Sequence, residues 1–190
     1  MKLLTMALAA ILVNNVVLTK YLGLCPFFGV SKNYKSAIGM GLAVTFVIFG
    51  ASMITYFLYH FILVPNDIEY MRLITFILVI ASFVQFTEMF IKKYSAQLYK
   101  TLGIYLPLIT TNCVVLYVAQ ENITMKYGFL EAFVNSLAVP AGYMLVLVLF
   151  ACMRERLDGS STGKSWKGVP IALVTAALMA LAFSGLAGIV

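Results

Sequence analysis

The chain has 190 residues, of which 63% are hydrophobic and only 11% are charged, and its formal net charge is +6. Soluble domains are about 45–50% apolar and about 25% charged, so this chain lacks the polar side chains needed to cover a surface in water. The composition excludes a soluble enzyme held by a membrane anchor, a disordered chain and a nucleic-acid-binding protein. It predicts an integral membrane protein in which residues 1–190 form a single domain.

Charged residues divide the chain into six apolar stretches, and we predict that each one crosses the membrane as a helix. Most of them reach the roughly 20 residues that a helix needs to span the hydrocarbon layer. No alternating pattern typical of barrel strands is present, so the predicted fold class is an all-α membrane protein. The stretches are residues 3–19, 37–64, 71–91, 102–119, 128–153 and 169–190.

The positions of the Lys and Arg residues predict the orientation of these spans. Cytoplasmic loops carry an excess of Lys and Arg, and here the odd-numbered loops hold ten of the thirteen. Both termini are therefore expected outside. The ten are Lys20, Lys32, Lys35, Lys92, Lys93, Lys100, Arg154, Arg156, Lys164 and Lys167; the other side has Lys2, Arg72 and Lys126.

The first and fourth spans contain residues that interrupt a helix at membrane depth. If the first span runs on to the lysines at 32 and 35, it contains Asn14-Asn15 and Gly23. The fourth contains Pro107 followed by Thr110-Thr111-Asn112. Proline removes a backbone donor, so we place the break of the fourth span at Pro107. Irregular backbone at this depth is tolerated only against protein or a cavity. Both spans are predicted to consist of broken half-helices.

The two halves of the chain, residues 1–97 and 98–190, share short sequence similarities. Residues 15–18 resemble 113–116, and residues 41–50 resemble 142–151, at offsets of 98 and 101 residues. With three spans in each half, the copies would have opposite orientations, which predicts a 3+3 inverted repeat with its site at the repeat interface. The identity is low, and coincidence is the alternative.

Cys25 and Cys113 lie at the two predicted breaks, and two hypotheses for them stay open. Free cysteine is often simply a buried core residue. Alternatively, two thiolates at the interface of two half-sites ligate a metal, which needs two further ligands from another chain for tetrahedral iron or zinc. A zinc site within the chain is not expected, because the three cysteines form no Cys-x-x-Cys pair.

Residues 13–32 and 102–116, which contain both cysteines, strongly resemble the RnfA family of membrane proteins. A related family is NqrE, which belongs to the sodium-translocating NADH:quinone reductase. The resemblance extends through residues 38–46 and 76–93, the Arg154–Leu157 loop and the final span. Tyr117 and Gln120 depart from it, because smaller or apolar residues are expected there.

The resemblance implies a membrane subunit of an ion-translocating ferredoxin:NAD⁺ oxidoreductase, the Rnf complex. It implies a heterodimer with a paralogous six-helix protein, RnfE, in which each partner contributes two cysteines to one intramembrane [2Fe–2S] cluster; here these are Cys25 and Cys113. Other Rnf subunits, namely RnfB, RnfC, RnfD and RnfG, would carry flavins and further iron–sulfur clusters. Ferredoxin and NAD⁺ would act through the whole complex in a bacterial or archaeal inner membrane, and the isolated chain would have no activity.

A path for the coupling ion, Na⁺ or H⁺, is expected near the breaks. The polar candidates are Asn14, Asn15, Thr110, Thr111 and Asn112. Glu88, a carboxylate within the third span, is a further candidate, although Lys92 and Lys93 are near enough to pair with it. The main alternative function is a secondary transporter with inverted repeats and no redox centre. The others are a membrane thiol oxidoreductase and a purely structural protein without a cofactor.

Overall fold

The computed structural model describes residues 2–31, 34–66, 69–94, 106–159 and 168–185, and all regular structure in these ranges is helical. The predicted all-α class is confirmed. In chain order the elements are α1 (Lys2–Leu8), the π-helical turn η1 (Ala9–Val13), α2 (Val16–Lys20), α3 (Leu24–Val30), α4 (Tyr34–Leu58), the π-helical turn η2 (Tyr59–Leu63), the 3-10 turn η3 (Glu69–Met71), α5 (Arg72–Tyr94), α7 (Leu106–Thr110), α8 (Cys113–Thr124), α9 (Phe129–Asp158) and α10 (Val169–Ser184).

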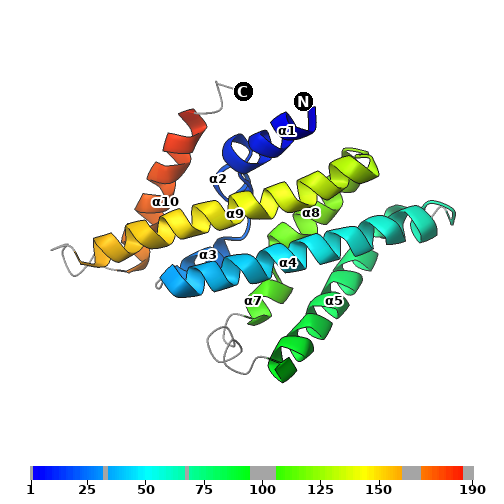
Figure 1. Ribbon diagram of the computed structural model, residues 1–190, viewed down its shortest axis with the longest axis horizontal. Coiled ribbons are helices and arrows are strands. Elements are labelled where there is room, and N and C mark those ends of the chain that lie inside the picture. The colour runs from blue at the N-terminus through cyan, green and yellow to red at the C-terminus, as the bar shows by residue number, and fades with distance from the viewer. Residues whose placement is uncertain (1, 32–33, 67–68, 95–105, 160–167, 186–190) are drawn as a thin grey trace.

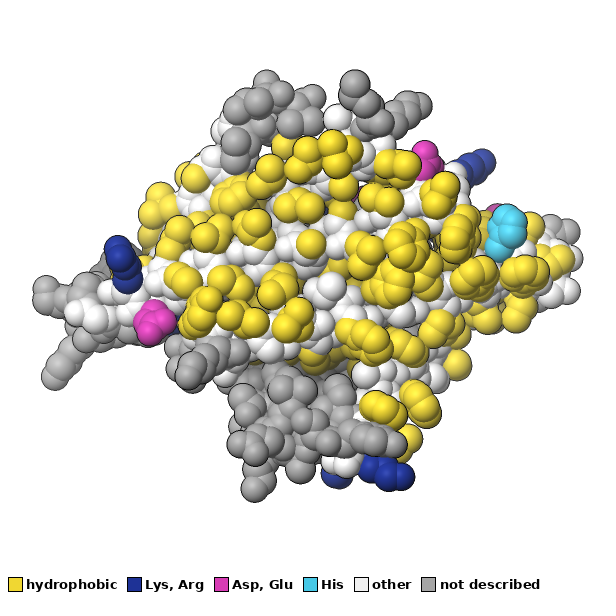
Figure 2. All heavy atoms as spheres, viewed as in Figure 1, with side chains coloured by type: hydrophobic (Ala, Val, Ile, Leu, Met, Phe, Trp, Pro, Cys, Tyr) yellow, Lys and Arg dark blue, Asp and Glu magenta, His cyan; other side chains and the backbone are white. Residues whose placement is uncertain are grey.

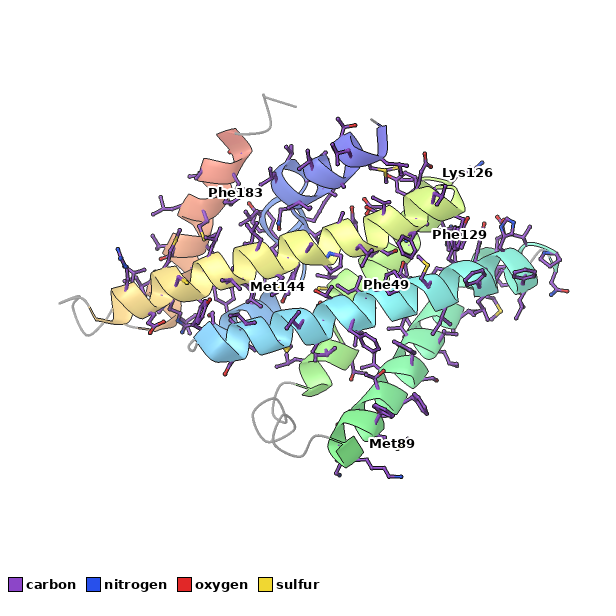
Figure 3. All side chains as sticks on the ribbon, viewed as in Figure 1. Phe49, Met89, Lys126, Phe129, Met144 and Phe183 are labelled. Atoms are coloured by element: carbon purple, nitrogen blue, oxygen red, sulfur yellow. The ribbon has the colours of Figure 1, made fainter. Side chains whose placement is uncertain are left out.

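The long helices α4 and α9 lie side by side at the centre of the molecule (Figure 1). Close approach is possible at Gly41, where an added Cβ would come within 2.7 Å of Met144 Cγ. Met144 lies on α9 facing α4 (Figure 3). Farther along the same contact, the rings of Phe49 and Phe133 pack edge to face. Helices α4 and α9 therefore form the central pair against which interrupted helices pack.

Three helical segments are long and apolar enough to cross a membrane, namely Ser36–Leu63, Glu69–Phe90 and Phe129–Leu157, among the residues that the structure describes. Two shorter apolar helices are Leu3–Val13 and Val169–Ser184. Figure 2 shows hydrophobic side chains across the middle of one face, while charged side chains lie toward its edges. This distribution is the one expected of a surface that faces lipid.

The first and fourth predicted spans are interrupted, as expected. The first consists of α1 with η1, then α2, then α3, with non-helical residues at Asn14-Asn15 and between Tyr21 and Gly23. The fourth consists of α7 and α8. Helices α1 and α2 and the turn η1 contact α9, and α8 contacts both α4 and α9.

The structure adds two details to the fourth span. Pro107 lies in α7, and the residues one turn before it, where its effect on the carbonyl ladder is expected, lie outside the described residues. The interruption comes at Thr111-Asn112. The span also continues beyond its predicted end at residue 119, since α8 runs to Thr124. Glu121, which lies outside the predicted span, is therefore helical.

Candidate functional site at two helix breaks

The first break is held by the side chain of Asn15. Its Oδ1 accepts a hydrogen bond from the Val17 N–H at 3.1 Å, which caps the N-terminus of α2. Its Nδ2 donates to the Ile11 carbonyl at 3.1 Å and to the Gly142 carbonyl at 2.8 Å. One buried amide therefore closes the preceding turn, starts the next helix and fastens both to α9.

The second break uses the same cap. Asn112 Oδ1 accepts from the Val114 N–H at 3.1 Å, and its backbone angles (φ −71, ψ 116) match those of Asn15 (φ −62, ψ 120). By this geometry Asn15 corresponds to Asn112, so Val16 is the counterpart of Cys113. The sequence similarity aligns Asn15 with Cys113, which is one residue out of register with the caps.

Gly23 joins the two breaks. Its backbone N–H donates to Cys113 Sγ at 3.0 Å. The residue has φ +76, a left-handed conformation that glycine adopts without steric cost. A Cβ here would lie 2.7 Å from Val114 Cγ2 and 2.9 Å from Tyr143 Cε2. Only glycine fits between the N-terminal ends of α3 and α8.

Cys25 and Cys113 both lie in first turns of helices that meet at Gly23. Cys25 is the second residue of α3, and Cys113 is the first of α8. The Tyr143 ring packs against Gly23, and its hydroxyl donates to the Gly23 carbonyl at 3.4 Å. Both thiols are exposed, which argues against the hypothesis that they serve core packing.

The residues expected to form an ion path are divided between two cavities. Thr110, Thr111 and Asn112 line a cavity of about 320 Å³ together with Cys113, against α5. Asn14 lines a different cavity, of about 120 Å³, at η1 and α8. Asn15 is buried in its capping role and lines neither of these two.

Glu88 lies apart from both cavities. It is partly exposed on α5, two helical turns beyond Ala81, the last α5 residue that lines the cavity beside Cys113. Seven residues of helix correspond to about 10 Å along the axis.

The sequence gives little indication of a buried polar network that lies next to the smaller cavity. Glu121 and Asn122 on α8 join Asn135 and Ser136 on α9 and Ser52 on α4. In the sequence these are single polar residues within apolar stretches, separated by up to 84 positions. The signal that is present is the run of polar residues that begins at Gln120, where the chain departs from its resemblance to the family.

Arg154 is a second buried group that the sequence does not single out as a site residue. It is 5% exposed, and its Nη1 donates to the Phe28 carbonyl at 3.0 Å and to Ser31 Oγ at 2.8 Å. These acceptors lie at the C-terminal end of α3, where a cation is favoured by the helix dipole. Cys25 occupies the first turn of the same short helix. Arg154 therefore fixes the element that presents one of the two thiols.

The fold and the paired thiols define a polytopic helical membrane protein that presents two cysteines at the ends of broken helices. The family described as "Rnf-Nqr subunit, membrane protein" matches residues 3–190, and the chain belongs to this family.

Proteins named as the A subunit of ion-translocating oxidoreductase complexes are similar to the chain over its whole length. The relative from Azotobacter vinelandii, named for an ion-translocating oxidoreductase complex, is 54% identical over 190 residues, covering 100% of this chain and 98% of the relative. The relative from Acetobacterium woodii, named for a Na⁺-translocating ferredoxin:NAD⁺ oxidoreductase complex, is 53% identical over 188 residues, covering 99% and 98%. The relative from Shewanella pealeana is 52% identical over 187 residues, covering 98% and 97%.

Proposed function

We propose that this chain is the RnfA membrane component of an ion-translocating ferredoxin:NAD⁺ oxidoreductase complex and that its two thiols hold part of an electron relay. The names of its full-length relatives support the complex. The observation that supports the relay is the contact of Gly23 with Cys113, which joins two helix breaks at two exposed thiols.

The donor set fits half of a [2Fe–2S] site. Such a cluster takes four thiolate ligands, and the described residues contain no group of three or more His, Cys, Asp or Glu side chains that could hold a metal. We propose that Cys25 and Cys113 supply two ligands and that a paralogous six-helix protein, RnfE, supplies the other two. When bound, the cluster would accept and release one electron.

The surrounding residues of this chain suit that role. The Gly23 N–H donates to the Cys113 sulfur, and hydrogen bonds to ligating sulfurs stabilise their negative charge. The N-terminal ends of α3 and α8 act in the same direction. Arg154 holds the far end of α3 through the Phe28 carbonyl and Ser31, which keeps Cys25 in place.

For the architecture we propose six spans arranged as a 3+3 inverted repeat, with both termini outside a bacterial inner membrane. The matching Asn15 and Asn112 caps support the repeat. Electron carriers on the two faces would be separated by about 30 Å of hydrocarbon, so a relay near the midplane would divide a distance too long for one fast transfer. RnfB, RnfC, RnfD and RnfG would hold the flavins and further clusters, and ferredoxin and NAD⁺ would react there.

The test is the iron content and low-temperature EPR spectrum of the chain co-purified anaerobically with its six-helix paralogue. We expect about two irons per heterodimer and a reducible signal. Both should be lost in Cys25→Ser and in Cys113→Ala. Cys152→Ser is the matched control, because Cys152 is an exposed cysteine of α9 that belongs to neither interrupted span, and this variant should retain the iron.

An intact heterodimer without iron would contradict the relay and favour a secondary transporter with no redox centre. Iron that persists in both cysteine variants would exclude the proposed ligands.

A further inference from the structure

The cavity of about 120 Å³ lies where η1 ends and near the end of α8. Its polar lining comes from Asn14, Tyr117, Glu121, Tyr127 and Asn135, and the rest of its wall is apolar. This volume accommodates a small ion together with water molecules. The cavity is thus a small chamber with a polar lining.

Glu121 is the charged group of this chamber. Its Oε1 accepts a hydrogen bond of 2.6 Å from the Tyr117 hydroxyl, and its Oε2 accepts a longer one of 3.4 Å from Asn135 Nδ2. In the described part of the chain no Lys, Arg or His pairs with Glu121. A carboxylate in a membrane domain that lacks a protein cation is balanced by a bound cation or by a proton.

A hydrogen-bonded network fixes the orientation of Asn135. Its Nδ2 donates to Asn122 Oδ1 at 2.9 Å, and Asn122 Nδ2 donates in turn to Ser52 Oγ at 2.8 Å and Ser136 Oγ at 3.0 Å. Ser136 donates to the Ala132 carbonyl at 2.6 Å, so Ser52 is the donor in the 2.7 Å bond between the two serines. The side-chain N–H and O–H groups of Asn122, Asn135, Ser52 and Ser136 therefore already donate hydrogen bonds within the protein.

Oxygen ligands remain on the cavity side. Among the described residues no hydrogen bond occupies Asn135 Oδ1 or the Asn14 side chain, although both residues line the chamber. The Tyr117 oxygen also keeps acceptor capacity, because its hydroxyl only donates to Glu121. Carboxylate, amide and hydroxyl oxygens are hard ligands that suit hard cations better than soft ones.

Backbone ends add to this preference. Asn14 caps the C-terminus of η1, with its N–H donating to the Ala9 carbonyl at 2.7 Å, and Glu121 lies in the last turn of α8. Carbonyl groups at helix C-termini carry partial negative charge, so both ends favour a cation. Membrane transporters place Na⁺ at the C-terminal ends of half-helices in this way.

We propose that this chamber is a Na⁺ site in which Glu121 supplies the charge and Asn14, Asn135 and Tyr117 supply further oxygens. One carboxylate among neutral ligands matches a monovalent ion. The proposal rests on the proposed ion-translocating function and locates one ion station in this chain. Cys113 and Glu121 lie at opposite ends of α8, eight residues or about 12 Å apart. Tyr117, one of the proposed oxygen ligands, is also one of the two residues at which the sequence departs from its resemblance to the family.

The test is equilibrium binding of ²²Na⁺ to the purified full-length chain in lipid nanodiscs, with choline replacing Na⁺ at constant ionic strength. We expect saturable binding of one ion per chain. Glu121→Gln should weaken binding by at least about tenfold, since it removes the only charge in the site. Asn14→Ala removes a side chain that makes no hydrogen bond within the described residues and should weaken binding by a few-fold with no loss of fold.

Glu155→Gln is the matched control, because Glu155 is an exposed carboxylate near the other end of α9 and should leave binding unchanged. Equal binding by wild type and Glu121→Gln would overturn the proposal, as would the absence of saturable Na⁺ binding in the wild type. Iron in the heterodimer is measured separately. If iron is present without Na⁺ binding, only the ion site fails; if Na⁺ binds without iron, the electron relay fails.

Discussion

Asn15 and Asn112 cap their helices in the same way but differ in what the rest of the side chain does. Asn15 Nδ2 is fully used, bridging the Ile11 and Gly142 carbonyls. Asn112 Nδ2 is buried and has no hydrogen-bond partner among the described residues. The residue after Asn15 is a buried valine, whereas the residue after Asn112 is an exposed cysteine beside a cavity of about 320 Å³.

The same asparagine cap therefore stands in two different surroundings. At the first break the cap is part of a tightly packed clamp, which holds η1 and α2 against α9 at Gly142, where an added Cβ would lie 3.0 Å from the Ile11 backbone. At the second break the Asn112 Nδ2 donates no hydrogen bond within the described residues, and the capped helix end lines a cavity. The Asn15 cap therefore belongs to a packed junction of three helical elements, whereas the Asn112 cap lies beside an exposed cysteine and a cavity.

The largest effect is expected where the two breaks touch. Gly23→Ala places a Cβ 2.7 Å from Val114 Cγ2 at a positive φ. The left-handed conformation and the overpacking together should destabilise the protein by about 3 kcal/mol. Iron in the heterodimer should fall as well, because α3 and α8 separate. Equilibrium unfolding in mixed micelles, followed by circular dichroism, measures the first effect.

Gly39→Ala provides the comparison for this variant. Gly39 lies inside α4, and an added Cβ there would meet nothing within 4 Å. Replacing a mid-helix glycine should stabilise the protein by up to about 1 kcal/mol. If the two alanine variants had the same stability, the close fit at Gly23 would not matter.

The two capping asparagines should differ in cost by about twofold. Asn15→Ala removes a cap worth about 1 kcal/mol and two further bonds worth about 0.6 kcal/mol each in a membrane domain, or about 2 kcal/mol in all. Asn112→Ala removes the cap alone, so we expect about 1 kcal/mol. The same unfolding measurement compares them. Equal losses would show that the bonds of Asn15 to Ile11 and Gly142 contribute nothing.

Much of the fold follows from the sequence because membrane helices are recognised by their apolar length. The breaks are predictable too, since Asn14-Asn15 and Asn112 are polar residues where lipid-facing backbone needs every hydrogen bond satisfied. The interruption before α8 lies at Thr111-Asn112, because the Asn112 cap decides where α8 starts.

The two thiols can be selected from the sequence, but the chamber around Glu121 cannot. Cys25 and Cys113 stand beside helix breakers, so they can be selected, whereas the contact of Gly23 with Cys113 depends on two segments 90 residues apart. The charge of Glu121 instead suggests a loop. Its partner Tyr117 lies one turn earlier on the same helix, but Asn135 reaches it only because α8 packs against α9, which a linear pattern does not encode.

Tyr143 allows the smallest and most specific test of how the breaks are joined. Its ring is 1% exposed and packs against Gly23, while its hydroxyl donates to the Gly23 carbonyl over a long 3.4 Å. Tyr143→Phe keeps the ring and should cost no more than about 0.5 kcal/mol, because so long a bond is weak. A loss of several kcal/mol in the phenylalanine variant, with iron also lost, would mean that the hydroxyl rather than the ring holds the two breaks together.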